Sequence, residues 1–260
     1  MLQSPADLLG LHGKNFVLVG GGPGLGLAIA RQLRGAGAKV FCIDNNLEMA
    51  ELVAKETGAV AWRADALDRA GLQVAFEAAE QQMGTIRGVV DIIGIAKLKP
   101  LNEFDDEAWH WQFSVVLRHA FLVLQVGSRF VESGGNFTFV GSLSGDRVVK
   151  QQTVYGTAKA ALHHLVRGAA LEYAQRKVRV NAVSPGFIRT PRLLQILTPE
   201  MWGRVDAAIP LGRAADPADI AGCVTFLASD LAAILTGQVI GADGGVSIAA
   251  ALPDLEWSAR

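Results

Sequence analysis

A glycine-rich turn between a short apolar run and an amphipathic stretch most strongly constrains how this chain can fold. The apolar run is NFVLVG (15–20), the turn is GGPGLG (21–26), and LAIARQLRGAG continues to residue 37. A short apolar run beside glycines predicts a buried strand, and the apolar spacing after the turn predicts a helix. The feature is therefore a strand–turn–helix unit.

The same alternation of apolar runs and helical patterns continues along the chain. Strands are expected at 15–20, 38–44, 59–65, 86–93, 134–142, 178–185 and 237–245, and helices at 27–37, 47–57, 68–83, 105–132 and 153–175. Nearly continuous apolar strands between helices predict a parallel sheet covered on both faces. Right-handed crossovers then predict an α/β, Rossmann-like, doubly wound fold with seven strands. We expect residues 1–260 to form one domain.

Charge and composition exclude several classes of function. The 24 Lys and Arg residues nearly balance the 25 Asp and Glu residues, and no basic stripe suggests a nucleic-acid partner. No apolar run approaches the roughly 20 residues that a membrane span needs. The segment MLQSPADLLG lacks the pattern of a signal peptide. No His, Cys or Asp spacing indicates a metal site, so we expect a cytoplasmic protein without a metal.

The glycine turn predicts a dinucleotide-binding loop. Gly20 would permit the tight turn, Gly24 would let the backbone approach a pyrophosphate, and Gly26 would allow close packing of helix on strand. The start of the following helix would attract the anion. The other predicted contacts in this loop are Gly22, Pro23 and Leu25. The alternative is a tight turn without a ligand.

Two aspartates at strand ends indicate how the adenosine half would be recognised. Asp44 lies 20 residues after Gly24, where a carboxylate can accept hydrogen bonds from a ribose diol and would repel a 2′-phosphate. NAD is therefore favoured over NADP. Asp65, followed by Ala66, would meet the adenine edge. For both aspartates, capping of the next helix remains an alternative.

A serine, a tyrosine and a lysine form the candidate reaction centre. Tyr155 and Lys159 are four residues apart on a predicted helix and therefore share a face. A phenol has a pKa of about 10, and a nearby ammonium would lower that pKa. Ser142, at the end of a predicted strand, could bind a substrate oxygen while Tyr155 exchanges the proton.

Together these motifs resemble those of the short-chain dehydrogenases/reductases over almost the whole chain. The residues that carry the resemblance are Gly20, Gly24, Gly26, Ser142, Tyr155, Lys159, the run Asn181-Ala-Val-Ser-Pro-Gly186 and Asp243-Gly-Gly245. The resemblance implies reversible, NAD(P)-dependent oxidation of an alcohol to a carbonyl. Tyr155 would be the acid and base, Lys159 would lower its pKa and hold the nicotinamide ribose, and Ser142 would orient the substrate.

The resemblance also implies further cofactor contacts and an assembly. Ile93 and Gly94 would pass the cofactor after the fourth strand. Pro185 and Gly186 would lead the chain past the nicotinamide, where Ile188 would offer its backbone and Thr190 its hydroxyl. Members of the family are commonly homotetramers, with helices near 105–132 and 153–175 and the last strand at their interfaces.

Two positions depart from the family pattern. The usual Asn-Asn-Ala-Gly is Asp91-Ile-Ile-Gly94 here, and Val116 stands where an Asn usually supports a proton relay. His119 and Ser114 are near Val116 but in a different register. One interpretation is a catalytically impaired NAD-binding interaction protein; the favoured one is an active enzyme. Asp91 is expected to accept backbone N–H groups from adjacent strand ends, with Ile92 and Ile93 beside the ribose.

The segment 189–213 is expected to cover the substrate. Its apolar residues are Leu193, Leu194, Ile196, Leu197, Met201 and Trp202. An apolar cover favours a hydrophobic or alicyclic secondary alcohol, unless these side chains pack on the core instead. A 3-oxoacyl reductase is the alternative enzyme. His163 and His164 are expected in packing or interface roles.

Overall fold

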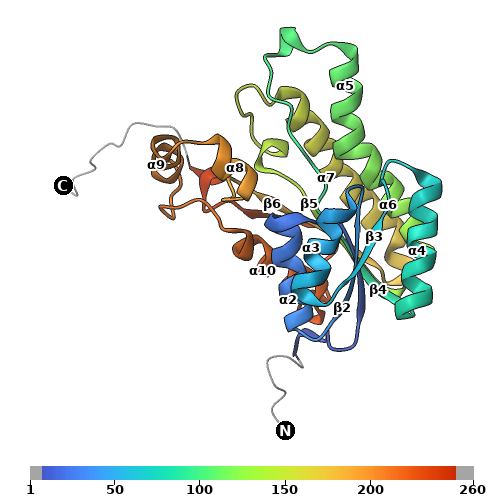
Figure 1. Cartoon of the computed structure of the whole chain (residues 1–260). Helices are drawn as coiled ribbons and strands as arrows, with labels where there is room; N and C mark the ends of the chain where they lie inside the picture. Colours follow the sequence, from blue (N-terminus) through green and yellow to red (C-terminus); the bar gives the residue numbers. More distant parts are fainter. Residues whose placement is uncertain (1–7, 250–260) are drawn as a thin grey trace.

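The computed structural model describes residues 8–249, which are built around one parallel sheet (Figure 1). Its strands are β1 (Asn15–Val19), β2 (Lys39–Asp44), β3 (Val60–Arg63), β4 (Ile86–Asp91), β5 (Val131–Val140), β6 (Arg179–Pro185) and β7 (Val239–Ala242). They lie in the order β3-β2-β1-β4-β5-β6-β7, and every neighbouring pair is parallel. The predicted seven-stranded, doubly wound α/β fold is confirmed.

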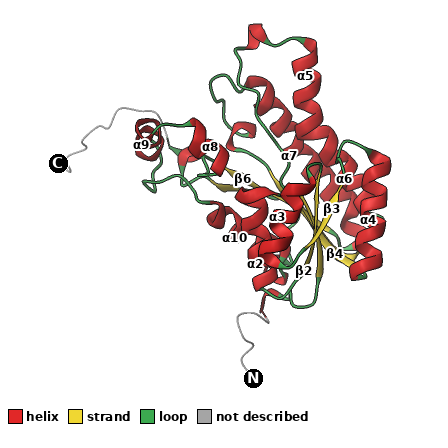
Figure 2. Cartoon of the chain, in the orientation of Figure 1, coloured by secondary structure: helices red, strands yellow, loops and turns green. Residues whose placement is uncertain are grey.

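Helices cover both faces of the sheet (Figure 2). On one face lie α2 (Leu27–Gly35), α3 (Leu47–Thr57) and α10 (Pro217–Ala228); on the other lie α4 (Arg69–Met83), α6 (His119–Gly127) and α7 (Thr153–Tyr173). Alternate residues of β1 serve the two faces: Phe16 and Leu18 pack with the first layer, Val17 and Val19 with the second. This is the two-residue period of a strand buried on both sides.

Three further helices lie outside these layers. They are α5 (Asp106–Phe113), α8 (Pro191–Ile196) and α9 (Pro199–Ala207), and α8 and α9 lie together at the left of Figure 1. Single turns of 3₁₀-helix occur at Leu101–Glu103, Leu143–Gly145, Ala174–Arg176, Asp230–Ala232 and Val246–Ile248. Within residues 8–249, no helix is long and apolar enough to cross a membrane.

The helix expected at 105–132 is interrupted and shorter than predicted. A π-turn at Ser114–Arg118 separates α5 from α6, α6 ends at Gly127, and β5 already begins at Val131. The first residues of β5 are VESGG, a polar and glycine-rich run without the apolar pattern of a buried strand, so the sequence did not indicate that β5 begins at Val131. Pairing of Val131 with Ile86 places the start of β5.

Helix α10 was not among the expected elements. It begins at Pro217, a favoured first helical residue, and the Asp219 carboxylate accepts the N–H of Asp216 at 2.8 Å. These residues were the available sequence signal. Helix α10 covers β6 and lies against α2.

The point where the chain reverses its direction across the sheet lies between β1 and β4. After β1 the chain builds β2 and β3 on one side and then crosses to β4 on the other. The loops after β1 and β4 therefore diverge, and such a crevice at the carboxyl ends of strands is where open α/β sheets bind ligands. Gly20 turns the chain here with a φ of +106°. It also lies directly against Ile92, since a Cβ on Gly20 would be 2.6 Å from Ile92 Cγ1.

Candidate active site

The glycine loop has the shape of an anion cradle. Gly22–Gly26 forms a π-turn that continues into α2, and no side chain caps either helical segment. The first N–H groups are therefore available to an anion. A Cβ at Gly26 would lie 2.7 Å from the Gly21 carbonyl carbon, so close packing requires glycine there. These features fit a dinucleotide diphosphate.

The loop after β6 returns to the same glycine cradle. Pro185 ends β6, Gly186 packs against Asp243, and Ile188 is buried. Thr190 then caps α8 through its hydroxyl, 3.4 Å from the N–H of Leu193. A Cβ on Gly24 would lie 3.7 Å from Thr190 Cβ. The segments predicted to bind the pyrophosphate and the nicotinamide therefore lie next to each other.

Asp44 connects the second strand to the glycine loop. Its Oδ2 accepts the N–H of Gly21 at 2.7 Å, and its Oδ1 accepts the N–H of Asn46 at 2.8 Å. Capping of the next helix, the alternative for Asp44, is wrong, because the Asn46 side chain caps α3 by accepting the N–H of Glu48. The carboxylate is thus held at the end of β2, beside the cradle.

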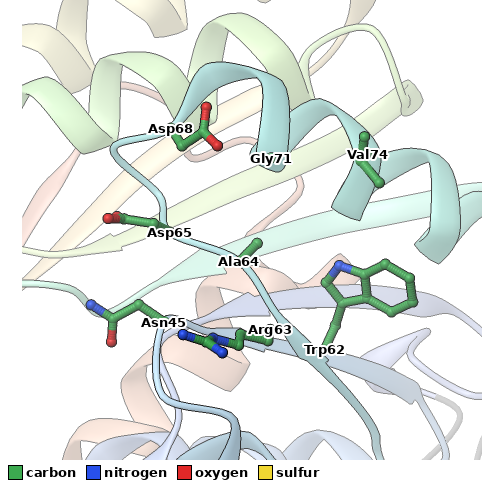
Figure 3. Close-up of a pocket in the computed structure, with 8 residues that line it drawn as sticks. All are labelled: Asn45, Trp62, Arg63, Ala64, Asp65, Asp68, Gly71 and Val74. Atoms are coloured by element: carbon green, nitrogen blue, oxygen red, sulfur yellow. The ribbon is translucent and has the colours of Figure 1, made fainter.

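Asp65 lies at the end of an open groove of about 720 Å³ beside the edge strand β3 (Figure 3). It is exposed and accepts the N–H of Leu67, whereas Asp68 caps α4, so the capping alternative for Asp65 is also wrong. Figure 3 shows Asn45, Arg63 and Asp65 at one end of the groove and Trp62 and Val74 at the other. The side chain of Ala66 is buried in the core, and its contact with the cofactor stays a prediction.

The groove adds residues that the sequence did not indicate as site residues. Arg63 is the last residue of β3 and is aligned with Asp44 in the strand register. Its place at a strand end was the available signal. Without the register, nothing in the sequence relates Arg63 to Asp44.

Ser142, Tyr155 and Lys159 come together at the carboxyl edge of the sheet. Ser142 follows β5, and its Oγ accepts the N–H of Ser144 at 3.2 Å. Lys159 lies one turn after Tyr155 on α7, with Nζ 5.9 Å from the centre of the phenol ring. Gly94 adjoins the same ammonium, since a Cβ there would lie 2.8 Å from Nζ.

Burial dominates the protonation of the two ionisable groups. It raises the pKa of Tyr155, and a hydrogen bond with Ser142 acts in the opposite direction. The lowering of the Tyr155 pKa by Lys159 stays a prediction. Lys159 Nζ donates a hydrogen bond to the Val140 carbonyl at 2.7 Å. Burial also lowers the pKa of Lys159 to about 8, while the charge of Asp91 opposes that change.

The prediction for the hydrogen-bond partners of Asp91 is wrong in one respect. Its Oδ1 accepts the N–H of Ile93, two residues on in its own chain, at 2.9 Å, rather than N–H groups of adjacent strand ends. The N–H of Ile92 already donates to Val19 of the neighbouring strand. The second partner of Oδ1 is the ring of His119, with Nε2 at 3.2 Å.

A second histidine supports the loop that carries Ser142. His163 is buried, its Nδ1 lies 3.2 Å from Asp146 Oδ1, and Ser184 Oγ donates to Asp146 Oδ2 at 3.0 Å. These contacts connect α7 and β6 with the loop that follows β5. Burial lowers the pKa of His163, with Asp146 opposing it. The expected packing role of His163 agrees with this geometry.

The expected substrate cover, 189–213, consists mainly of α8 and α9. Leu193, Leu197 and the buried Trp202 pack together in a small cluster of their own, and the Arg189 guanidinium lies 4.7 Å from the Trp202 ring centre. Leu194, Ile196 and Met201 remain about half exposed. The packing alternative therefore holds for Leu193, Leu197 and Trp202, whereas contact of Leu194, Ile196 and Met201 with a substrate stays a prediction.

Comparisons with known proteins agree with this arrangement. A family model described as "Enoyl-(Acyl carrier protein) reductase" matches residues 20–247. The 2-(S)-hydroxypropyl-CoM dehydrogenase 3 of Xanthobacter autotrophicus is 35% identical over 91% of this chain and 98% of its own length. The galactitol 2-dehydrogenase (L-tagatose-forming) of Cereibacter sphaeroides is 34% identical over 92% of this chain and 96% of its own.

A solved structure shows the same relationship. The short-chain dehydrogenase/reductase from Serratia marcescens is 30% identical, with a TM-score of 0.86 over 91% of this chain and 99% of that one. The chain therefore belongs to the short-chain dehydrogenase/reductase family, and it is an oxidoreductase by that membership.

A substitution of Gly141 tests how His163 supports Ser142. A Cβ at this position would overlap His163 Nε2. Gly141→Ala should therefore cost about 1–3 kcal/mol in the free energy of unfolding through overpacking, and it should lower turnover because Ser142 is the next residue. Chemical denaturation and steady-state kinetics measure the two effects.

Two further variants complete the Gly141 experiment. Gly141→Ala combined with His163→Ala should recover part of the lost stability, because it removes the overlap. Gly241→Ala is the control, since a Cβ there meets nothing within 4 Å. Equal stability of Gly141→Ala and Gly241→Ala would contradict the packing role of Gly141.

Proposed function

We propose that this protein is an NAD-dependent dehydrogenase that interconverts a secondary alcohol and a ketone. The observation that carries the proposal is the convergence of Ser142, Tyr155 and Lys159 beside the glycine cradle. Relatives named for oxidation at a secondary alcohol support the reaction class. Residues 1–260 would act as one catalytic domain in the cytoplasm, with 189–213 over the substrate.

Tyr155, assisted by Ser142, transfers the proton to and from the substrate oxygen. In oxidation, the Tyr155 phenolate takes the proton from the substrate oxygen, and in reduction the phenol returns it. Ser142 donates a hydrogen bond that orients that oxygen. Lys159 supplies the positive charge that stabilises the phenolate. When bound, the nicotinamide supplies the acceptor or donor of the hydride.

Asp44 supports the preference for NAD. Two backbone N–H groups hold its carboxylate at the edge of the glycine loop. A 2′-phosphate placed there would meet a fixed negative charge at short range. A preference for NAD favours oxidation over biosynthetic reduction as the working direction.

The half-exposed Leu194, Ile196 and Met201 support a hydrophobic or alicyclic substrate. The names of two relatives point instead to polyols, galactitol and D-threitol. The description of the matching family model keeps an acyl-carrier reductase as the second candidate. A panel with alicyclic alcohols, polyols and a 3-oxoacyl thioester distinguishes the three classes.

A homotetramer is the proposed assembly. Apolar side chains are exposed on the helices expected at the interfaces: Trp109 on α5, Phe121 on α6 and Leu171, 80% exposed, on α7. Burying these surfaces would be favourable.

Removal of the Tyr155 hydroxyl tests the enzyme directly. Tyr155→Phe should lower kcat about 10²- to 10⁴-fold, the usual contribution of a positioned acid or base, while NAD binding is retained. Tyr173→Phe is the matched control, because its hydroxyl bonds the Leu124 carbonyl away from the site. NAD binding without turnover of any alcohol in the panel, and without an effect of Tyr155→Phe, would favour the impaired interaction protein.

Removal of the Asp44 charge tests the cofactor. The kcat/KM should be higher with NAD than with NADP, and Asp44→Ala should reduce the ratio of the two kcat/KM values about 10- to 100-fold, the value of one hydrogen bond to a charged group. Glu51→Gln, on the exposed side of α3, removes one charge nearby as a control. A wild-type preference for NADP would refute this role of Asp44.

Sedimentation measures the assembly. The wild-type protein should sediment as a tetramer, and Leu171→Asp should shift it toward smaller species, because a charge would be buried at an interface. A monomer at micromolar concentration in the wild type would contradict the proposed assembly.

A further inference from the structure

Three ionisable side chains are buried together where β4 ends. Asp91 comes from β4, His119 from the first turn of α6, and Lys159 from α7; each is at most 2% exposed. Burial of three such groups is costly unless they compensate one another. The arrangement therefore requires a reason beyond packing.

The hydrogen bonds of this cluster leave specific atoms unpaired. Asp91 Oδ1 has two partners, His119 Nε2 at 3.2 Å and the N–H of Ile93 at 2.9 Å. Among the described residues, Asp91 Oδ2 and His119 Nδ1 have no hydrogen-bond partner. Lys159 Nζ has one, the Val140 carbonyl. A carboxylate oxygen and ammonium N–H groups thus remain available within the same buried region.

The strand register explains how the two charges come close. Asp91 is aligned with Phe139 of β5, and Val140, whose carbonyl holds Lys159, is the next residue of that strand. The negative charge of Asp91 acts on Lys159 and opposes the effect of burial on the pKa of the ammonium. Tyr155 and His163 on α7 and His119 on α6 are the other titratable groups around it. The Nδ1 of His163 is in contact with the carboxylate of Asp146.

The π-turn brings His119 into this position. Val116, buried in the turn, has no polar side chain, and the N–H of His119 donates to Ser114, the residue five positions earlier. His119 follows Val116 by about one turn and reaches β4. Asp91, one departure from the family pattern, is therefore partnered by a residue that lies three positions after the other departure, Val116.

We propose that the buried pair of Asp91 and His119 is a positioning device that keeps Lys159 charged and fixed beside Tyr155. His119 orients the carboxylate through Oδ1, and the carboxylate compensates the ammonium. Asp91 and His119 are positioning residues, since they act through Lys159. The inference rests on the proposed function for the use of Lys159, but its main test requires no turnover.

The charge of Lys159 can be followed directly. The protein is labelled with ¹³Cε-lysine, and the Lys159 signal is assigned by its absence in Lys159→Arg. The wild-type midpoint is expected near pH 8. Asp91→Asn should lower it by at least one pH unit, because the compensating charge is lost. Glu107→Gln, which removes an exposed charge on α5, should leave it unchanged. An unchanged midpoint in Asp91→Asn overturns the proposal.

His119 variants provide a second line if Asp91→Asn fails to fold. His119→Leu removes the ring that contacts Oδ1 and should also lower the Lys159 midpoint, since the carboxylate is no longer held in its orientation toward the ammonium. His119→Gln offers an amide donor and should stay nearer the wild-type value. Equal midpoints in the Leu variant and the wild type overturn the role of His119.

The pH dependence of kcat separates positioning from simple structural damage. The loss in Asp91→Asn should be at least threefold greater at pH 8 than at pH 6, because the acidic solution recharges Lys159. A loss that is equal at both values overturns the proposal. If the Lys159 midpoints shift as expected but neither the wild type nor any variant turns over an alcohol, the proposed function fails and the inference stands.

Discussion

The parallel pairing of β1 with β4 is the constraint on which the site depends. It places the glycine loop after β1 and the Asp91–Gly94 segment after β4 side by side, although about 70 residues separate them. All seven strands run in one direction, so Ser142 after β5 and Pro185 at the end of β6 reach the same edge. A single sheet edge therefore collects groups from four separate parts of the chain.

The chemistry of that edge is governed by burial. Desolvation raises the pKa of Tyr155 and lowers that of Lys159, so both groups are shifted toward their neutral forms. A phenol and an amine in neutral form are poor partners for proton exchange at neutral pH. The nearby charge of Asp91 and the hydroxyl of Ser142 act against these shifts, which gives the polar residues around Tyr155 a clear electrostatic purpose.

Much of the fold could be predicted from sequence because each strand is buried on both faces. Such strands appear as apolar runs, and they are punctuated by glycines or by residues that start helices. The prediction was weakest around residues 105–132, where the π-turn that separates α5 from α6 leaves no mark in the pattern and β5 begins with the polar, glycine-rich run VESGG. It also missed α10, whose start is marked by only Asp216 and Pro217.

The sequence by itself determined the alternation of elements, the glycine cradle and the one-turn spacing of Tyr155 and Lys159, because these depend on local backbone geometry. Only the tertiary structure decided that Asp91 meets His119, that Asp44 bonds the glycine loop instead of capping α3, and that His163 occupies the space beside Gly141. Those contacts join residues 22 to 28 positions apart on different elements. Their formation depends on how strands and helices pack in three dimensions, and the period of a local pattern carries no information about that packing.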